Sequence, residues 1–133
     1  MPDETRVEIT SATDIVTARQ KGRALALELG FESVEATLIA AAISEVSRNI
    51  VEYAKRGEII LQASGNGTRH GVCVVARDEG PGIADVAQAL QYGYSTRRGL
   101  GVGLPGAKLL MDEFDIISKV GQGTTITMRK WLD

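Results

Sequence analysis

Cysteine is almost absent from this chain, since Cys73 is the one cysteine in 133 residues and no disulfide can form within the chain. Cys73 lies in the apolar run 72–76, where a thiol usually packs as a small apolar side chain. No apolar run approaches the about 20 residues that cross a bilayer, and the first residues lack the apolar core of a signal peptide. These absences predict a cytoplasmic protein that does not enter a membrane.

An excess of charge of one sign is also absent. The chain has 15 Lys and Arg against 17 Asp and Glu, which gives a net charge of -2. Without a broad basic field, neither nucleic acid nor an anionic membrane surface is expected as the main partner. With no linker or repeat to divide it, residues 1–133 are predicted to form one domain. Glycine, at 15 residues, is the one excess, and it requires explanation.

Hydrophobic periodicity predicts the order strand, helix, helix, hairpin, helix, hairpin. The first helix should begin near Ala12 and stop at Gly30, and the second should span residues 34–53. Leu104 and Pro105 open the third helix, because proline is tolerated in a first turn, and this helix should reach Asp112 or Glu113. The expected strands are residues 6–10, 58–63, 71–77, 115–120 and 124–129. This order predicts a two-layer α/β sandwich of the α+β kind, with helices on one face of a mostly antiparallel sheet.

Glu45 and Asn49 interrupt the apolar pattern of the second predicted helix. They are four residues apart, so their side chains project from the same side of the helix about one turn apart. A buried carboxylate needs a partner, and an ion pair with Arg48 would provide one. The pair also suits catalysis, with Glu45 as a base and Asn49 as an oxygen ligand of Mg²⁺. This pair alone leaves both interpretations open.

The sequence Asp-Glu-Gly-Pro-Gly at residues 78–82 ends a predicted strand. Gly80 and Gly82 can adopt positive φ and allow a flat ligand to approach the backbone. Asp78 can accept a hydrogen bond from an exocyclic amino group such as that of adenine. The alternative is a tight turn in which Asp78 is hydrogen-bonded within its own loop.

A glycine-rich loop at residues 99–104 runs directly into the third predicted helix. Free N–H groups and the helix dipole at such an end favour phosphate oxygens, although the same glycines could form a structural turn. In the polar segment before the loop, Arg97 or Arg98 could balance phosphate charge. The residues expected beside the phosphates are Gly99, Leu100, Gly101, Val102, Gly103 and Leu104.

Together, these motifs resemble the N, G1, G2 and final threonine boxes of the GHKL ATPase and kinase superfamily. Within it, the chain is similar to the small bacterial anti-sigma factors and serine kinases, in particular the switch kinases of the stressosome. Residues 43–50 and 103–114 carry that closer similarity. The four boxes are Glu45-x-x-x-Asn49, Asp78-x-Gly80-x-Gly82, Gly99-x-Gly101-x-Gly103 and Gly123-Thr124-Thr125.

The resemblance implies a Bergerat-type fold that binds ATP and Mg²⁺. By this resemblance, Asn49 is the Mg²⁺ ligand and Asp78 is the adenine contact. Gly82 is the close backbone neighbour of the adenine, and Thr124 supports the same side. Glu45 would be the base that takes the proton from a substrate hydroxyl.

The same resemblance implies an ATP-dependent serine/threonine-protein kinase of a bacterial stress-response pathway based on partner switching. Its substrates would be STAS-domain antagonist and scaffold proteins, and the released kinase would bind and activate a PP2C-type phosphatase. The alternative is an anti-sigma factor with serine kinase activity that binds a sigma factor directly. A third hypothesis is an ATP-regulated binding module without catalysis. A sensor histidine kinase is not expected, because the dimerisation helices with their acceptor histidine are missing.

Overall fold

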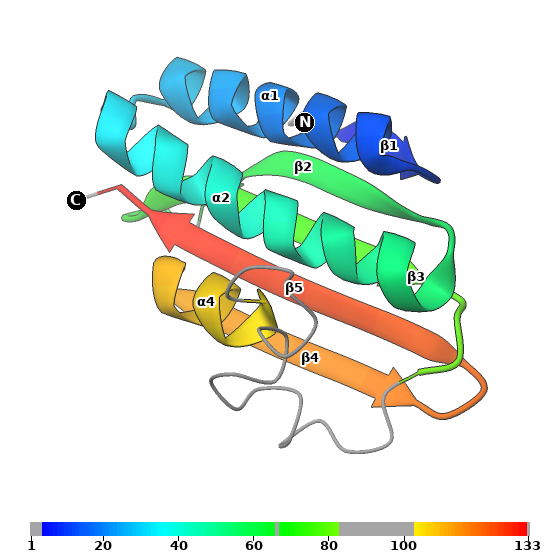
Figure 1. Ribbon diagram of the computed structural model, residues 1–133. Helices are drawn as coiled ribbons and strands as arrows, with labels where there is room; N and C mark the ends of the chain where they lie inside the picture. The colour runs from blue at the N-terminus through cyan, green and yellow to red at the C-terminus, as the bar shows by residue number, and fades with distance from the viewer. Residues whose placement is uncertain (1–3, 66, 83–102, 133) are drawn as a thin grey trace.

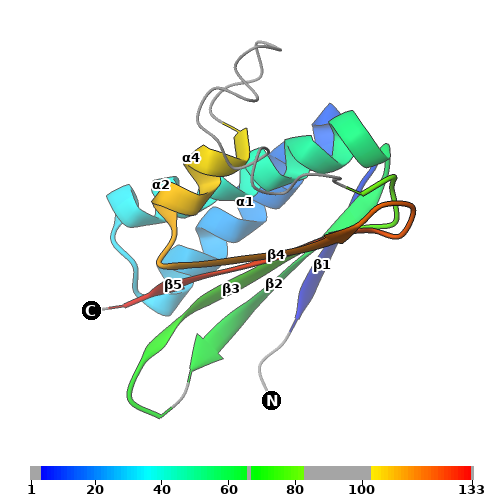
Figure 2. The same cartoon turned by 90° about the horizontal axis from the view of Figure 1, so that it is seen from below.

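The computed structural model describes residues 4–65, 67–82 and 103–132. These residues form two layers, with α1, α2 and α4 over one face of a five-stranded sheet (Figure 1). Seen from below, these helices lie on the same side of the sheet (Figure 2), which confirms the predicted fold class. In chain order the elements are β1 (Thr5–Ile9), α1 (Ala12–Leu29), α2 (Ser33–Asn49), the π-helical turn η1 (Ile50–Ala54), β2 (Gly57–Gly65), β3 (His70–Asp78), α4 (Gly103–Leu110), β4 (Glu113–Lys119) and β5 (Gly123–Trp131).

The sheet has the strand order β1-β2-β3-β5-β4, and each neighbouring pair is antiparallel. Successive side chains of a strand point to opposite faces. On β3, therefore, Val72, Val74 and Ala76 face the helices and are buried in the core. The two predicted hairpins are confirmed as β2–β3 and β4–β5.

Small residues on α1 allow it to approach α2 closely. Ala18, Gly22 and Ala26 repeat every four residues and are buried, and a Cβ atom on Gly22 would collide with the Ile43 side chain. Gly30 ends α1 in the left-handed conformation, with φ 107°, as the predicted helix stop requires. The first helix therefore has its predicted bounds.

The second helical segment covers its predicted span but has a π-helical last turn, and the third helix ends earlier than predicted. The α-helical part of α2 ends at Asn49, and η1 continues it to Ala54 with a hydrogen bond of 2.9 Å from the Lys55 N–H to the Ile50 carbonyl. Helix α4 ends at Leu110, short of the predicted end at Asp112 or Glu113, and the Asp112 carboxylate instead accepts the Trp131 N–H at 2.8 Å. No helix of the described part of the chain is long and apolar enough to cross a membrane.

The sheet face opposite the helices carries charged side chains above an apolar layer. Arg6 lies 3.1 Å from Glu58, and Arg77 lies 3.1 Å from the same carboxylate. Ile60 and Cys73 on the same face are nevertheless buried, and burial raises the pKa of the Cys73 thiol. The prediction that Cys73 packs as a small apolar side chain is thus confirmed.

Candidate functional site

The register of β3 and β5 brings two of the predicted site residues together. Asp78 pairs directly with Thr124 at the ends of these strands. Because side chains alternate along each strand, and Asp78 and Thr124 are two residues from the core-facing Ala76 and Ile126, both lie on the helix-covered face. They are 9% and 5% exposed, respectively. The hydrophobic pattern of the sheet therefore places a carboxylate and a hydroxyl side by side at the ends of two inner strands.

Asp78 is hydrogen-bonded within its own loop. Its Oδ1 atom accepts the Gly80 N–H at 2.9 Å. Burial raises the pKa of the Asp78 carboxyl, while hydrogen bonds from the backbone of Gly80 and Thr124 oppose that rise. A carboxylate offers about four lone-pair positions, so these bonds leave acceptor capacity for a ligand. The turn and the ligand contact weighed for Asp78 are therefore compatible.

Glycine is required at positions 80 and 82 for different structural reasons. Gly82 has φ 77°, as predicted, whereas Gly80 does not have a positive φ. Instead, a Cβ on Gly80 would come within 2.5 Å of the Ala54 Cβ. The prediction of positive φ is thus wrong for Gly80, which is required for close packing against η1. The Gly121 N–H, which donates to the Pro81 carbonyl at 2.8 Å, fastens this loop to the β4–β5 hairpin.

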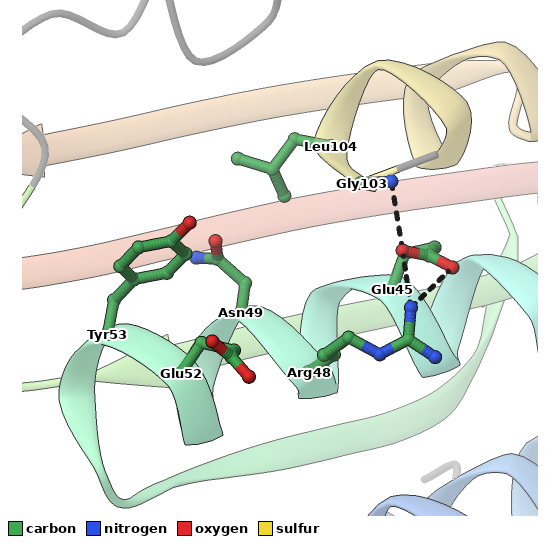
Figure 3. A pocket seen from close by; sticks show the side chains of 7 residues that line it. All are labelled: Glu45, Arg48, Asn49, Glu52, Tyr53, Gly103 and Leu104. Carbon is green, nitrogen blue, oxygen red and sulfur yellow. Dashed lines mark hydrogen bonds and ion pairs between the residues drawn. The ribbon is translucent and has the colours of Figure 1, made fainter. Parts of the chain in front are cut away.

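A cavity lies between the end of α2 and the start of α4 (Figure 3). Glu45 and Asn49 both line it, as expected from their spacing of one helical turn. The side chains of Asn49 and Tyr53 extend toward Leu104 on α4. The residues that line the cavity are Glu45, Arg48, Asn49, Glu52, Tyr53, Gly103 and Leu104.

The Glu45 carboxylate accepts hydrogen bonds from a residue of α2 and from a residue of α4. Its Oε1 atom accepts the backbone N–H of Gly103 at 3.0 Å, and Arg48 Nη1 donates to its two oxygens at 3.2 and 3.1 Å. The ion pair considered for Glu45 and Arg48 is therefore present. With this ion pair formed, the Glu45 carboxylate still lies in the cavity at the N-terminus of α4, where the helix dipole favours an anion.

The turn η1 connects this cavity to the loop that follows Asp78. It begins directly after Asn49, and its last residue, Ala54, packs against Gly80. Single π-helical turns are frequently found at functional sites. The arrangement forms two neighbouring groups rather than one pocket, because the residues that line the cavity do not include Asp78 or Thr124.

Several predicted site residues cannot be placed. Arg97, Gly99, Leu100, Gly101 and Val102 lie outside the described residues, so their roles remain predictions. The end of the same loop is described. There, Gly103 has φ 64° and lines the cavity, and Leu104 lines the cavity while packing into the core.

Sequence reasoning missed Tyr53 and Glu52 as residues of the cavity. Tyr53 follows Asn49 by four residues, the same spacing that separates Asn49 from Glu45. Extending that spacing by one more turn would have identified Tyr53, because side chains at this spacing share a helix face.

Two groups on the walls of this cavity suit a phosphate and Mg²⁺. The Gly103 N–H at the start of α4 already bonds a carboxylate, so this helix end accepts an anion such as a phosphate. Asn49 offers an amide oxygen, and Mg²⁺ commonly takes one or two protein ligands and completes its coordination with waters and phosphates. No group of three or more His, Cys, Asp or Glu suited to a metal exists among the described residues. The donor set therefore suits a metal held mainly through phosphates.

Comparison with protein families gives one match over most of the chain. Residues 10–130 match the histidine kinase-like ATPase domain. This range contains every residue of the site, including those outside the described part of the chain.

Similar proteins of known type fall into two groups. The chain is 47% identical over 132 residues to the serine/threonine-protein kinase RsbT of Bacillus subtilis strain 168, which covers 99% of both chains. It is 31% identical over 121 residues to the anti-sigma F factor of Thermoanaerobacter sp. strain X514, covering 86% of this chain and 83% of that protein.

The fold also resembles that of a solved structure. The RsbU and RsbW domains of Rv1364c from Mycobacterium tuberculosis match with a TM-score of 0.66 at 23% identity. The match covers 100% of this chain but only 33% of the longer one, so this chain spans about a third of that solved chain.

Proposed function

The chain belongs to the histidine kinase-like ATPase domain family and is a protein-serine/threonine kinase within it, and we propose that it phosphorylates a STAS-domain antagonist in a bacterial partner-switching pathway. The observation that carries the proposal is the position of Glu45. Its carboxylate lies at the N-terminus of α4, bonded to the Gly103 N–H and one helical turn from Asn49. The proposed base thus lies at the helix end where a phosphate of ATP is expected to bind.

In the proposed reaction, Glu45 accepts the proton of a serine or threonine hydroxyl. The hydroxyl oxygen then forms a bond to the γ-phosphorus, the bond from that phosphorus to its bridging oxygen breaks, and ADP leaves with the electron pair. Bound Mg²⁺, held by Asn49, would neutralise charge on the phosphate oxygens. Backbone N–H groups of the glycine loop would stabilise the same charge.

Asp78 is proposed to select adenine. An aspartate acceptor suits the exocyclic amino group of adenine, and Thr124 lies directly opposite on β5. The proposed remainder of the nucleotide site is the glycine loop with Arg97, which would contact the phosphates.

The similarity to RsbT supports the proposed pathway. RsbT is named as a serine/threonine-protein kinase, and the resemblance to stressosome switch kinases implies STAS-domain antagonist and scaffold proteins as substrates. After phosphorylation, the released kinase would bind and activate a PP2C-type phosphatase. The proposal places the protein in the cytoplasm.

An anti-sigma factor with serine kinase activity is the second candidate. The anti-sigma F factors among the relatives favour it. The higher identity to RsbT, 47% against 31%, supports the switch kinase instead.

The test is phosphate transfer to a STAS-domain protein encoded next to this chain. The purified protein is incubated with that partner and γ-labelled ATP, and the labelled product is analysed for phosphoserine and phosphothreonine. The proposal predicts Mg²⁺-dependent label on one of these residues, and absence of transfer would contradict it. Binding assays with sigma factors from the same genome separate the second candidate, because the switch kinase should bind none of them.

A further inference from the structure

We propose that Arg48 is a positioning residue that holds the Glu45 carboxylate in place for phosphate transfer. The inference rests on the proposed role of Glu45 as the base. Arg48 lies one turn after Glu45 on α2, and its Nη1 atom is 3.2 and 3.1 Å from the two carboxylate oxygens. One guanidinium nitrogen thus spans both oxygens of the proposed base.

The surroundings of this pair separate it from an ordinary surface ion pair. The Glu45 side chain is 12% exposed and that of Arg48 is 34% exposed. The carboxylate is therefore mostly buried, while the guanidinium group is partly open to solvent. A mostly buried carboxylate needs a partner, so loss of Arg48 can also lower stability. A purely stabilising role predicts an unchanged kcat in the folded variant, whereas a positioning role predicts a lower kcat.

The second donor to Glu45 explains why Arg48 would matter during the reaction. The Gly103 N–H donates to Glu45 Oε1, but it also belongs to the helix end proposed to bind phosphate. One N–H group does not make two full hydrogen bonds, so a phosphate at this position would compete with the carboxylate. Arg48 belongs to the same helix as Glu45, and its bonds to the carboxylate do not depend on Gly103. It is therefore the donor that would remain once ATP is bound.

Loss of Arg48 should consequently impair transfer more than ATP binding. A carboxylate without this donor can occupy several rotamers, and fewer of them would face the acceptor hydroxyl. Removal of the partner that orients a functional group typically costs 10 to 100-fold, as seen at metal sites. We expect a loss of kcat of about this size, with the KM and Kd for ATP changed by less than about threefold.

The experiment compares Arg48→Ala, Arg48→Lys and Arg6→Ala in the full chain. Arg6 is the matched control, because it forms an Arg–Glu pair at 3.1 Å on the opposite face of the sheet. Lysine keeps one charged donor, so Arg48→Lys should recover part of the lost kcat, and Arg6→Ala should keep the wild-type kcat. Circular dichroism and thermal unfolding show whether each variant is folded. Wild-type kcat in a folded Arg48→Ala variant would overturn the proposal.

A second readout uses the protein without nucleotide. The amide proton of Gly103 should resonate downfield while it is bonded to the Glu45 carboxylate. Arg48→Ala and Glu45→Gln should both move this NMR signal upfield, and Arg6→Ala should not. An unmoved signal in Arg48→Ala would contradict the positioning role. This measurement also separates the two proposals: absence of transfer by the wild-type protein would count against the kinase mechanism, whereas the Gly103 signal tests the Arg48 contact by itself.

Discussion

At the scale of single residues, the two carboxylates of the site have different surroundings. Glu45 lies in a cavity with a guanidinium group and a backbone N–H as donors. Asp78 is buried at the end of β3, and that burial raises its pKa. Environments of this kind assign different tasks to chemically similar groups. We propose proton transfer as the task of Glu45 and adenine recognition as the task of Asp78.

Replacing Asp78 by asparagine should weaken ATP binding without unfolding the protein. The asparagine oxygen can still accept the Gly80 N–H, but its NH₂ group would then face the amino group of adenine, and two donors do not bond. We expect the Kd for ATP to rise by at least about tenfold, the loss of one good hydrogen bond to a charged group. Titration with a fluorescent ATP analogue measures it. An unchanged Kd would refute the adenine contact.

The raised pKa of Asp78 also predicts how stability depends on pH. The folded protein holds the Asp78 proton more tightly than the unfolded chain does, so this group lowers stability as pH rises through a window that begins near its ordinary value of 3.8. Relative to Asp78→Asn, the wild type should lose free energy of unfolding as pH increases through that window. Urea unfolding of both proteins from pH 3 to 7 tests the sign. A wild type that gains stability relative to the variant over this range would contradict it.

At the scale of elements, the β4–β5 hairpin and the loop after β3 support each other. The Gly121 N–H bonds the Pro81 carbonyl, and Ser118 and Thr124 share a hydrogen bond of 2.7 Å across the hairpin. A Cβ on Gly123 would collide with the Asp78 carbonyl oxygen. The final threonine box thus lies against the strand end that carries the proposed adenine contact.

Two glycines of this hairpin form a matched pair for mutation. Gly121 has φ 81° and Gly123 has φ 97°, but a Cβ on Gly121 would meet nothing within 4 Å. Gly121→Ala should cost only the strain of a left-handed residue, about 1 to 2 kcal/mol. Gly123→Ala should cost clearly more, because the strand must also shift away from Asp78. Urea unfolding measures both, and equal losses would contradict this packing.

Local sequence signals predicted most of the fold. The apolar period and Gly30 gave both ends of α1, and alternating apolar runs gave the two hairpins. The helical span of residues 34–53 was predicted, but not that its last turn, η1, is π-helical, because Ile50 stays buried in η1 just as it would in an α-helix. Hydrophobic periodicity therefore cannot distinguish the two. Leu38 fitted the apolar pattern as well, yet it is 37% exposed.

The site was predicted as a set of motifs but not as contacts. Spacing placed Glu45 and Asn49 on one side of a helix. The bond from the Gly103 N–H to Glu45 joins residues 58 positions apart, and no local pattern reports such a contact. The packing of Gly80 on Ala54 depends in the same way on η1, which was not predicted.

At the scale of the whole molecule, the proposed site lies where the two layers meet. Helices α2 and α4 provide residues of the cavity, while β3 and β5 provide Asp78 and Thr124. A ligand that binds both groups would therefore bridge the helix layer and the sheet. Such a ligand should stabilise the fold as a whole, because it binds the folded chain and not the unfolded one.

ATP with Mg²⁺ should consequently raise the unfolding temperature. At about 100 times its Kd, a ligand adds about 2.7 kcal/mol to the free energy of unfolding, which corresponds to a rise in Tm on the order of 10 °C for a domain of this size. Removal of Mg²⁺ with EDTA should reverse most of the rise. Differential scanning calorimetry measures both effects. In Asn49→Ala, EDTA should change the Tm of the ATP-bound protein little. A full Mg²⁺-dependent rise in Tm in that variant would disprove the proposed metal ligand.

The central claim is that Glu45 is the base of a kinase, and Glu45→Gln tests it most directly. Glutamine keeps the size of the side chain and can still accept the Gly103 N–H, but it cannot take a proton from the acceptor hydroxyl. The measurement is the ratio of phosphate transfer to ATP affinity in the variant and in the wild type. We predict a Kd for ATP within about threefold of wild type and transfer reduced by at least about 100-fold. Transfer at the wild-type rate, or a parallel loss of binding and transfer, would contradict the assignment.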